Sequence, residues 1–537
     1  MSAAPAGPGG PATAGAAGSV GPATAGAAGP GGPATLFTDV LVYRPGAPGG
    51  VLGPTDVLVD GDRIAVIGAE ARHRAARAEV IAGHGHHLLV PGLVNAHFHS
   101  PANHLKGALP SLPLELFMLY ESPAAEALRP TPREAYLRTA LGVLEMLRGG
   151  TTAVQDDAFL MPDPEPAVID AILQAYADLG IRATVALDQP ELPEVAKLPF
   201  LEQLAPAELL DELRRPAPMA PGVLLERYEH LITHWHGAAD GRLRAAVSIS
   251  APQRVSPEYF AALDDLSRRH RLPLFAHLLE TKTQRVLAAE QPRFAGRSLV
   301  RYTADLGLLS ERLNVIHAVW TDEDDLDLIA AAGSVIVHNP VSNLRLGSGV
   351  MPFRAARDRG IPIALGVDEA ICNDAVDMWS VVRTAGLIHN ITGLDSDRWP
   401  SAAEVLDCLW RGGAAAMLRG GELGAVAEGQ LADLALLDLH SLAFTPLNDV
   451  PGQLVYCETG SSVVLTMVAG RVVFEHGRVT TADEAQLLAE VREVFARKRR
   501  ALEAAHADAG RLFPLYQRVV RAAAATDVGL TRWVASG

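Results

Sequence analysis

Eight short apolar runs that alternate with helix-like stretches constrain the fold of this chain more than any other feature. Short runs bounded by turn residues predict buried strands, and strands that alternate with helices are typical of βα units around a parallel sheet. Eight is the number of such units that closes a barrel. We therefore predict an α/β protein built on a (β/α)8 TIM barrel over residues 91–424. The predicted strands are GLVNAHFH, TTAVQDD, RATVALD, LRAAVSIS, LPLFAHLLE, LNVIHAV, SVIVHNP and IPIALGVDE.

The helix after the first predicted strand carries its own start and stop signals. Thr131-Pro132-Arg133-Glu134 reads as a capping box with proline at the first helical position. Gly149 and Gly150 are expected to end this helix.

Strand-like sequence occurs on both sides of the predicted barrel. LFTDVLVYRP and DVLVDGDRIAVIG precede it, with a tight turn at Asp60-Gly61-Asp62. ADLALLDL and SSVVLTMVAGRVVFEHGRV follow it, with a turn at Ala469-Gly470-Arg471. We predict that residues 36–90 and 425–480 combine into one small composite β-sandwich domain.

The two ends of the chain differ in composition. Residues 1–35 consist almost entirely of Ala, Gly, Pro, Ser and Thr, so they have too little apolar bulk to offset the entropy of ordering and predict a disordered leader. They also lack the basic start and Leu-rich core of a signal peptide. Residues 481–537 predict a helical extension, because DEAQLLAEVREVFARKRRALEAA is amphipathic with a basic, solvated face.

Charge and cysteine content exclude several classes of partner. The chain has 46 Lys+Arg against 62 Asp+Glu, a net charge of -16, without a basic aromatic patch, which argues against nucleic acid. The sequence contains no uncharged apolar run of about 18 residues, so we expect no membrane partner. Three scattered cysteines without a CxxC pair fit a reducing, cytoplasmic location.

Polar side chains gather where the predicted strands end, which is where barrel enzymes place their active sites. Residues two apart on a strand point the same way, so His97 and His99 can both reach one ion near the barrel axis, while Phe98 faces the helices. The other strand-end groups are His277 and Glu280 on the fifth strand, His317 on the sixth and Asp368 after the eighth.

A single histidine in an apolar strand is more often a hydrogen-bonded core residue than a metal ligand. The joint pattern is different, because HxH, HxxE, a further histidine and an aspartate at the ends of successive strands are hard to obtain by packing alone. Three neutral imidazoles with one carboxylate suit Zn²⁺, with Fe²⁺ and Mn²⁺ as alternatives.

These motifs resemble those of the amidohydrolase superfamily, and within it the ATZ/TRZ and cytosine-deaminase-like metal-dependent aminohydrolases. The resemblance runs from about Leu36 to Val479. It rests on PGLVNAHFHSPANHLKG, GTTAVQDD, AHLLET, VIHAVWTD, VHNPVSNLRLGSG and ALGVDEAICND, which are similar to the family's strand motifs and occur in the expected order.

The resemblance implies a role for each matching residue. Metal ligands are implied at His97, His99, His277 and Asp368, which hold one divalent ion per chain. Catalytic roles are implied for Glu280, His317 and Asp368. A bound metal lowers the pKa of its water and so supplies hydroxide, and Glu280 is placed to protonate a ring nitrogen as ammonia leaves.

Residues around this set are candidates for contact with substrate. Many relatives have glycine after the final aspartate, whereas Glu369 follows Asp368 here. Glu369 could therefore contact a basic substrate nitrogen, or could be a solvated or helix-capping carboxylate. The candidates for substrate binding are Gln155, Asp156, Trp320, Asn339 and Glu369.

The leading functional expectation is hydrolytic deamination of an amino-substituted N-heterocycle: a nucleobase, a nucleoside-like compound, a pterin or a triazine. The alternative reaction is dechlorination or dealkylamination of a triazine-like ring, and the alternative class is a non-catalytic amidohydrolase-like binding protein. Hydrolysis of cyclic amides at a two-metal site would need a bridging lysine on the fourth strand, and VSISAPQ has none. Relatives are often dimers or larger, so a homo-oligomer is compatible with the resemblance.

Overall fold

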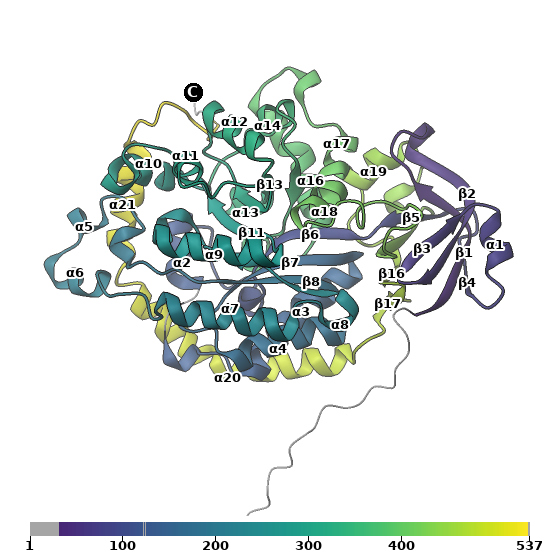
Figure 1. Cartoon of the computed structure of the whole chain (residues 1–537), viewed down its shortest axis with the longest axis horizontal. Helices are drawn as coiled ribbons and strands as arrows, with labels where there is room; N and C mark the ends of the chain where they lie inside the picture. Colours follow the sequence, from purple (N-terminus) through teal and green to yellow (C-terminus); the bar gives the residue numbers. More distant parts are fainter. Residues whose placement is uncertain (1–31, 122, 124, 535–537) are drawn as a thin grey trace, which may run out of the picture.

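The computed structural model describes residues 32–121, 123 and 125–534. It has an α/β fold in which parallel strands occupy the centre and helices surround them, with an antiparallel-rich sheet at one end (Figure 1). Most of the predicted leader lies outside the described residues. In the described part of the chain, no helix is both long and apolar enough to cross a membrane.

All eight predicted central strands are present, and the fourth is divided in two at Ala246. They form one four-stranded and one five-stranded parallel sheet, in the orders β6-β7-β8-β9 and β10-β11-β12-β13-β14. Their bounds are β6 (Leu93–Phe98), β7 (Thr151–Phe159), β8 (Arg182–Asp188), β9 (Leu243–Ala245), β10 (Val247–Ser248), β11 (Leu274–Leu278), β12 (Leu313–His317), β13 (Val335–His338) and β14 (Ile363–Leu365).

The two parallel sheets meet at both of their edges. The amide of Asp368, just beyond β14, donates to the carbonyl of His97 in β6 (2.9 Å), and Phe98 and Asp368 form an isolated parallel bridge. At the other edge the amide of Ala246 donates to the carbonyl of Val185 in β8 (2.8 Å). The first of these contacts brings β6 and the segment after β14 together.

Helices connect successive strands. The α-helices of at least six residues between β6 and β15 are α2 (Leu114–Glu121), α3 (Pro132–Arg148), α4 (Pro166–Leu179), α6 (Ala207–Leu213), α7 (Pro221–Trp235), α9 (Pro257–His270), α10 (Lys282–Glu290), α11 (Leu299–Asp305), α12 (Glu323–Ala332), α13 (Pro340–Arg345), α14 (Phe353–Asp358), α16 (Met378–Ile388) and α17 (Ala402–Asp407).

Helix α3 begins at the predicted capping box. The Thr131 side chain accepts a hydrogen bond from the Glu134 amide, and the Glu134 side chain accepts one from the Thr131 amide (2.8 Å). Gly149 is the C-cap of the helix. Phe98 faces this helix as predicted, because a Cβ on Gly142 of α3 would lie 2.8 Å from the Phe98 ring. The glycine thus allows α3 to pack closely on β6.

Segments from both sides of the central strands combine in one nine-stranded sheet, which we call the terminal sheet. Its path is β18-β17-β16-β15-β5-β1-β2-β3, with β4 paired to β1. The junction is the antiparallel pairing of β5 with β15. The strands are β1 (Gly32–Tyr43), β2 (Val51–Gly61), β3 (Arg63–Ile67), β4 (Glu79–Ala82), β5 (His87–Pro91), β15 (Leu434–Asp438), β16 (Val463–Val468), β17 (Arg471–Glu475) and β18 (Arg478–Val479).

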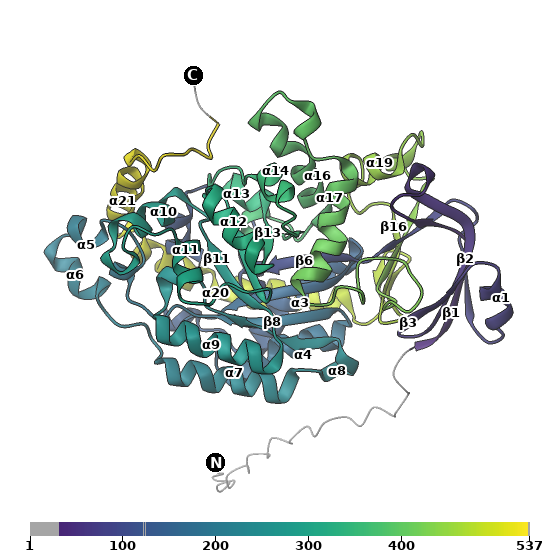
Figure 2. The ribbon, with the colours of Figure 1, turned by 45° about the horizontal axis from the view of Figure 1, so that its top comes forward.

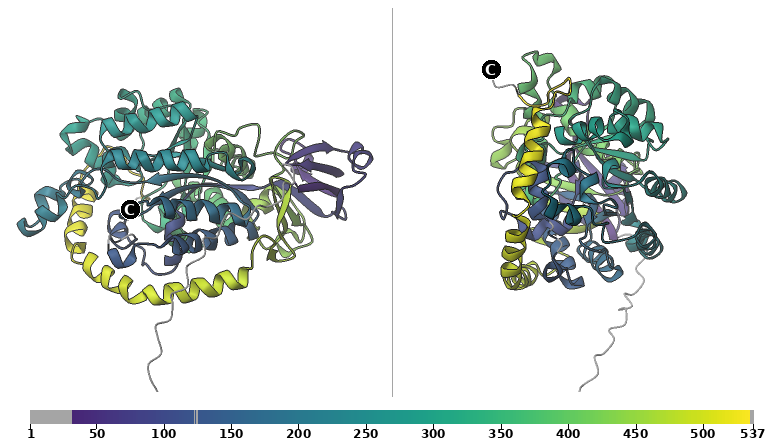
Figure 3. Two further views of the ribbon diagram at one scale, coloured as in Figure 1. Left: turned by 60° about the horizontal axis from the view of Figure 1, so that its bottom comes forward. Right: turned by 90° about the vertical axis from the view of Figure 1, so that its left-hand side faces the viewer.

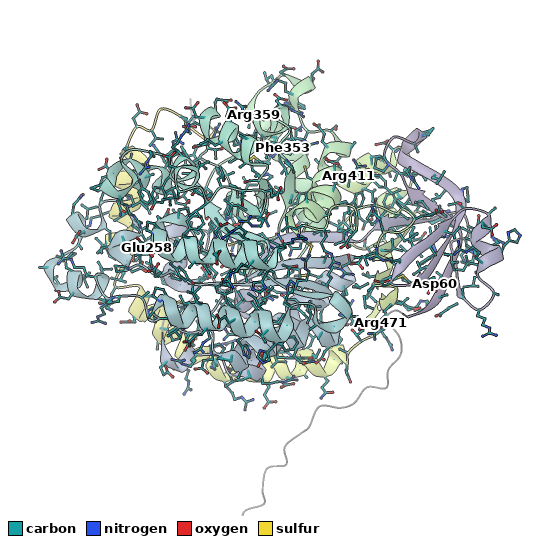
Figure 4. All side chains as sticks on the ribbon, viewed as in Figure 1. Asp60, Glu258, Phe353, Arg359, Arg411 and Arg471 are labelled. Carbon is teal, nitrogen blue, oxygen red and sulfur yellow. The ribbon has the colours of Figure 1, made fainter. Side chains whose placement is uncertain are left out.

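Strand β1 begins at Gly32, earlier than the predicted boundary at residue 36, because Gly32 and Thr35 pair with Gly61 and Val59 of β2. The two predicted tight turns lie against each other: a Cβ on Gly470 would lie 1.9 Å from the Gly61 carbonyl oxygen. Asp60 and Arg471, which flank these turns, lie at the same side of the terminal sheet in Figure 4.

Two helices follow the terminal sheet. Helix α20 (Glu484–Ala509) runs along the outside of the central part (Figure 3) and is joined to α3 by two bidentate pairs, Arg133–Glu490 and Arg148–Glu484. Helix α21 (Phe513–Ala525) then packs against α2 and α10 (Figure 2).

Candidate metal and active site

The strand-end histidines predicted from the sequence lie together at the carboxyl ends of the parallel strands. His97 belongs to β6, His277 to β11 and His317 to β12, while His99 directly follows β6. Ring centroids of His97 lie 4.6 Å from His99, 5.0 Å from His277 and 5.9 Å from His317. All four imidazoles are buried.

Asp368 joins this cluster from the loop after β14. Its Oδ1 lies 3.3 Å from His97 Nε2 and 3.4 Å from His99 Nε2, and ligand atoms of all three residues lie within 4.8 Å of one another. Asp368 and His317 both have positive φ, at 66° and 73°. Such strained backbone in residues other than glycine is often found at functional sites.

Hydrogen bonds to backbone fix the orientation of two of these rings. His99 Nδ1 donates to the Asp157 carbonyl (2.6 Å), and His277 Nδ1 donates to the Ser250 carbonyl (2.7 Å). A carbonyl can only accept, so each Nδ1 carries the hydrogen and each Nε2 keeps its lone pair free.

The donor set fits a divalent metal. His97 Nε2 is buried and has no hydrogen-bond partner among the described residues. Burial lowers the pKa of His97 to about 4, so its ring is neutral and can ligate. Burial raises the pKa of Asp368, but the close contact with the surrounding imidazoles, that of His97 first, outweighs this effect and leaves the pKa well below its usual range.

Glu280 and His317 lie beside this cluster. Glu280 Oε2 is 3.5 Å from His317 Nε2, and His317 Nδ1 donates to Asn343 Oδ1 (3.0 Å). Burial, followed by the charge of Asp368, raises the pKa of Glu280 well above its usual range. The Glu280 carboxyl group therefore keeps its proton to a higher pH than an ordinary glutamate does.

A small cavity of about 40 Å³ opens onto these groups, and we call it the inner cavity. The sequence did not indicate Glu121, Asp188 or Arg254, which line it together with Met118 and Phe159. It is lined by His99, Leu114, Met118, Glu121, Phe159, Asp188, Arg254, His277, Glu280, His317, Leu346, Asp368, Glu369 and Cys372.

Glu369 is the one predicted substrate-contact residue that lines the inner cavity. Burial, followed by the charge of Glu121, raises the pKa of Glu369 well above its usual range. Glu369 therefore keeps its proton to a higher pH than an ordinary glutamate does. Cys372 Sγ lies 3.6 Å from Glu369, and burial also raises the pKa of this thiol, so it is not an activated nucleophile.

The other four predicted substrate contacts do not line the inner cavity. The Gln155 side chain donates a hydrogen bond to the Ala96 carbonyl (2.8 Å). The Asp156 carboxylate accepts hydrogen bonds from the Ser100 amide and from the Tyr176 hydroxyl of α4. Trp320 is fully buried and donates to the Ser348 carbonyl (2.7 Å). Asn339 contacts His317, with 3.3 Å between Asn339 Nδ2 and His317 Nδ1.

A second, larger cavity of about 290 Å³ lies beside the inner cavity and shares Leu114 and Leu346 with it. Helix α21 contributes Val520 and Ala524 to the wall of this outer cavity, and the residues after α21 contribute Trp533. Trp533 is held by donating to the Gly347 carbonyl (2.9 Å) and packs edge-on against Trp320.

Comparison with known proteins places the chain in a family. The profile of the amidohydrolase family matches residues 88–473. The chain belongs to the amidohydrolase family. It is therefore a hydrolase of carbon–nitrogen bonds, and metal binding at its buried His/Asp cluster is consistent with this family.

Individual relatives agree with this placement. A 5-methylthioadenosine/S-adenosylhomocysteine deaminase of Nitratidesulfovibrio vulgaris is 35% identical over 83% of this chain and 92% of its own length. A 5'-deoxyadenosine deaminase of Methanosarcina mazei is 29% identical over 84% of this chain and 95% of its own length. The zinc-bound structure of an adenosine deaminase from Xanthomonas campestris has 28% sequence identity and a TM-score of 0.74. The match covers 86% of this chain and 99% of that one. A triazine hydrolase from Arthrobacter aurescens, at 24% identity and a TM-score of 0.76, shares the fold.

Proposed function

We propose that this amidohydrolase hydrolytically deaminates an amino-substituted heterocycle of the nucleoside type. The observation that carries the proposal is Glu280, a buried carboxyl group with a raised pKa that lies 3.5 Å from His317 and beside the His/Asp cluster. A carboxylic acid in that place can protonate a ring nitrogen next to the carbon that carries the amino group. The names of the relatives described above support the nucleoside class.

We propose that His97, His99, His277 and Asp368 hold one Zn²⁺ per chain. When bound, this ion lowers the pKa of a water molecule and supplies hydroxide at neutral pH. The zinc-bound neighbour supports this choice of ion. The eight parallel strands that carry these residues are proposed to form one closed (β/α)8 barrel, and the terminal sheet to fold as a β-sandwich.

The protein residues have separate roles in the proposed reaction. Asp368, ionised beside the histidines, accepts the proton of the attacking water. His317 keeps a free Nε2 lone pair, because its Nδ1 donates to Asn343, and so accepts a hydrogen bond from the nucleophile. Glu280 gives its proton to the ring nitrogen as the oxygen adds to the adjacent carbon. Asp368 then passes the water proton to the amine, the carbon–amine bond breaks and ammonia leaves. The proton of the new hydroxyl group returns to Glu280 as the carbonyl forms.

Ammonia release by the zinc-loaded full chain tests this proposal. The panel contains adenosine, 5'-deoxyadenosine, 5'-methylthioadenosine, S-adenosylhomocysteine, cytosine, a pterin, an aminotriazine and chlorotriazine. We expect release of ammonia from at least one of the nucleosides, with kcat/KM above the values for cytosine and the triazines. Exclusive turnover of the triazines, or chloride release without ammonia release, would contradict the proposal.

A further inference from the structure

Outside the barrel site, one other set of described residues brings metal-ligating atoms close together. Ligand atoms of His86, Asp438 and His440 lie within 4.8 Å of one another. We propose that these three residues form a second divalent-metal site, on the terminal sheet, for a transition metal of the Zn²⁺, Ni²⁺ or Cu²⁺ class. The proposed deaminase function does not use these residues, so the inference stands apart from it.

The backbone fixes where two of these side chains start. His86 lies in the turn before β5, and the turn is held by hydrogen bonds from the Gly83 amide to Thr38, from Gly85 to Asp39 and from His87 to Gly83. Asp438 is the last residue of β15 and pairs with His87 in register. The Leu439 amide donates to the His86 carbonyl (3.0 Å), which ties the two segments together.

Hydrogen bonds also leave the right atoms free for a metal. His86 Nδ1 donates to the His84 carbonyl (3.1 Å), so the ring keeps its lone pair on Nε2. That Nε2 lies 3.7 Å from Asp438 Oδ1. Among the described residues Asp438 has no Lys or Arg ion-pair partner, and its carboxylate accepts only from the His440 amide (2.8 Å).

His440 completes the set and is the side chain that has to move. Its ring is stacked on that of His86, with centroids 3.8 Å apart and an angle of 5° between the planes. A metal lies in the plane of each imidazole that binds it, so the two parallel rings cannot share an ion as they stand. His440 is exposed, and rotation of its side chain can bring the ligand atoms to the roughly 3.3 Å separation of a tetrahedral zinc site.

The chemistry of the three ligands selects the class of ion. Two neutral imidazoles and one carboxylate favour Zn²⁺, Cu²⁺ and Ni²⁺ over Mg²⁺ and Ca²⁺, which prefer all-oxygen sites. Water completes the coordination, since Asp438 and His86 are partly exposed. A bound ion would join the turn before β5 to the end of β15, two segments far apart in the sequence.

Zinc titration of the full chain, with its barrel site already filled, tests the proposal. We expect the wild-type protein to bind one further Zn²⁺, and the variant His86→Ala/His440→Ala to bind at least about tenfold more weakly while keeping the barrel-bound zinc. His476→Ala is the matched control. This histidine lies in the turn between β17 and β18 with 92% of its side chain exposed, so its loss should leave binding unchanged.

Added Cu²⁺ gives a second readout through the nitrogen couplings in its electron paramagnetic resonance spectrum. The wild-type protein should show two coordinating imidazoles and His440→Ala one. This exposed single substitution also serves if the double variant does not fold. No further zinc bound by wild type, or wild-type affinity in His440→Ala, would overturn the second site.

Discussion

At the scale of single residues, the proposed reaction depends most on the proton carried by Glu280. Glu280→Gln keeps the shape of the side chain but removes the transferable proton, so zinc should stay bound while kcat falls by about 10²-fold or more. The measurement is kcat and KM at saturating zinc, with metal content checked in parallel. If Glu280 only orients neighbouring groups, kcat will stay within a few-fold of wild type.

The same carboxyl group predicts the direction of the pH dependence. Burial raises the pKa of Glu280 well above its usual range, and the protonated form is the active one. Activity should therefore be present below this raised pKa and decrease as the pH rises through it. The pH profile of kcat measures this, and Glu280→Gln should lose this alkaline decrease, because its amide does not titrate.

At the scale of structural elements, the hairpin β16–β17 depends on a glycine that touches another turn. Gly470 has φ +73°, and a Cβ there would lie 1.9 Å from the Gly61 carbonyl oxygen. Gly470→Ala should destabilise the protein by roughly 2–5 kcal/mol, from left-handed backbone strain plus overpacking. Gly477→Ala is the control, because Gly477 has φ +76° with nothing within 4 Å, and it should lose only about 1–2 kcal/mol. Equal urea midpoints for the two variants would contradict the argument.

Sequence periodicity predicted the central elements well, because strands, caps and turns are local. His97 in β6 and His99 directly after it lie in one cluster, as the HxH spacing predicted, and each other strand-end group lies near the carboxyl end of its strand. Asp188 could have been found in the same way, since it is the last residue of β8. Glu121 and Arg254 could not, because α2 and the turn after β10 bring them to the cavity only through tertiary packing.

The substrate contacts were harder to predict because they depend on where a strand ends. Strand β7 continues to Phe159, beyond the predicted end at Asp157, and Phe159 rather than Gln155 or Asp156 lines the inner cavity. Asp156 instead points to Tyr176 of α4. A shift of one residue along a strand moves a side chain to its opposite face.

At the scale of the whole molecule, a buried ion pair joins the central strands to the terminal sheet. Arg182 of β8 donates two hydrogen bonds to Asp433, which immediately precedes β15, and each side chain is 2% exposed. Asp433→Ala should destabilise the protein by about 3–5 kcal/mol, because it leaves a buried guanidinium unpaired. Asp358→Ala removes the exposed partner of Arg398 and should cost less than about 1 kcal/mol. Urea unfolding compares the two.

The segment after α21 contributes to the outer cavity from the far end of the described chain. Trp533→Ala should raise KM several-fold and leave kcat nearly unchanged, because we expect the wall of the outer cavity to contact parts of the substrate away from the reacting carbon. Trp399→Ala is the control, since Trp399 also donates to a backbone carbonyl but lines neither cavity. An unchanged KM for Trp533→Ala would remove this segment from substrate binding.

The pairing of β5 with β15 sets an order for folding during synthesis. Strand β5 leaves the ribosome about 340 residues before its partner, a delay of roughly 20–70 s at ordinary translation rates. During that time one hydrogen-bonding edge of β5 is unpaired, and an unpaired edge can join with other chains. The nascent chain is therefore exposed to aggregation at this edge until β15 arrives, and this is the period in which a chaperone would protect it most.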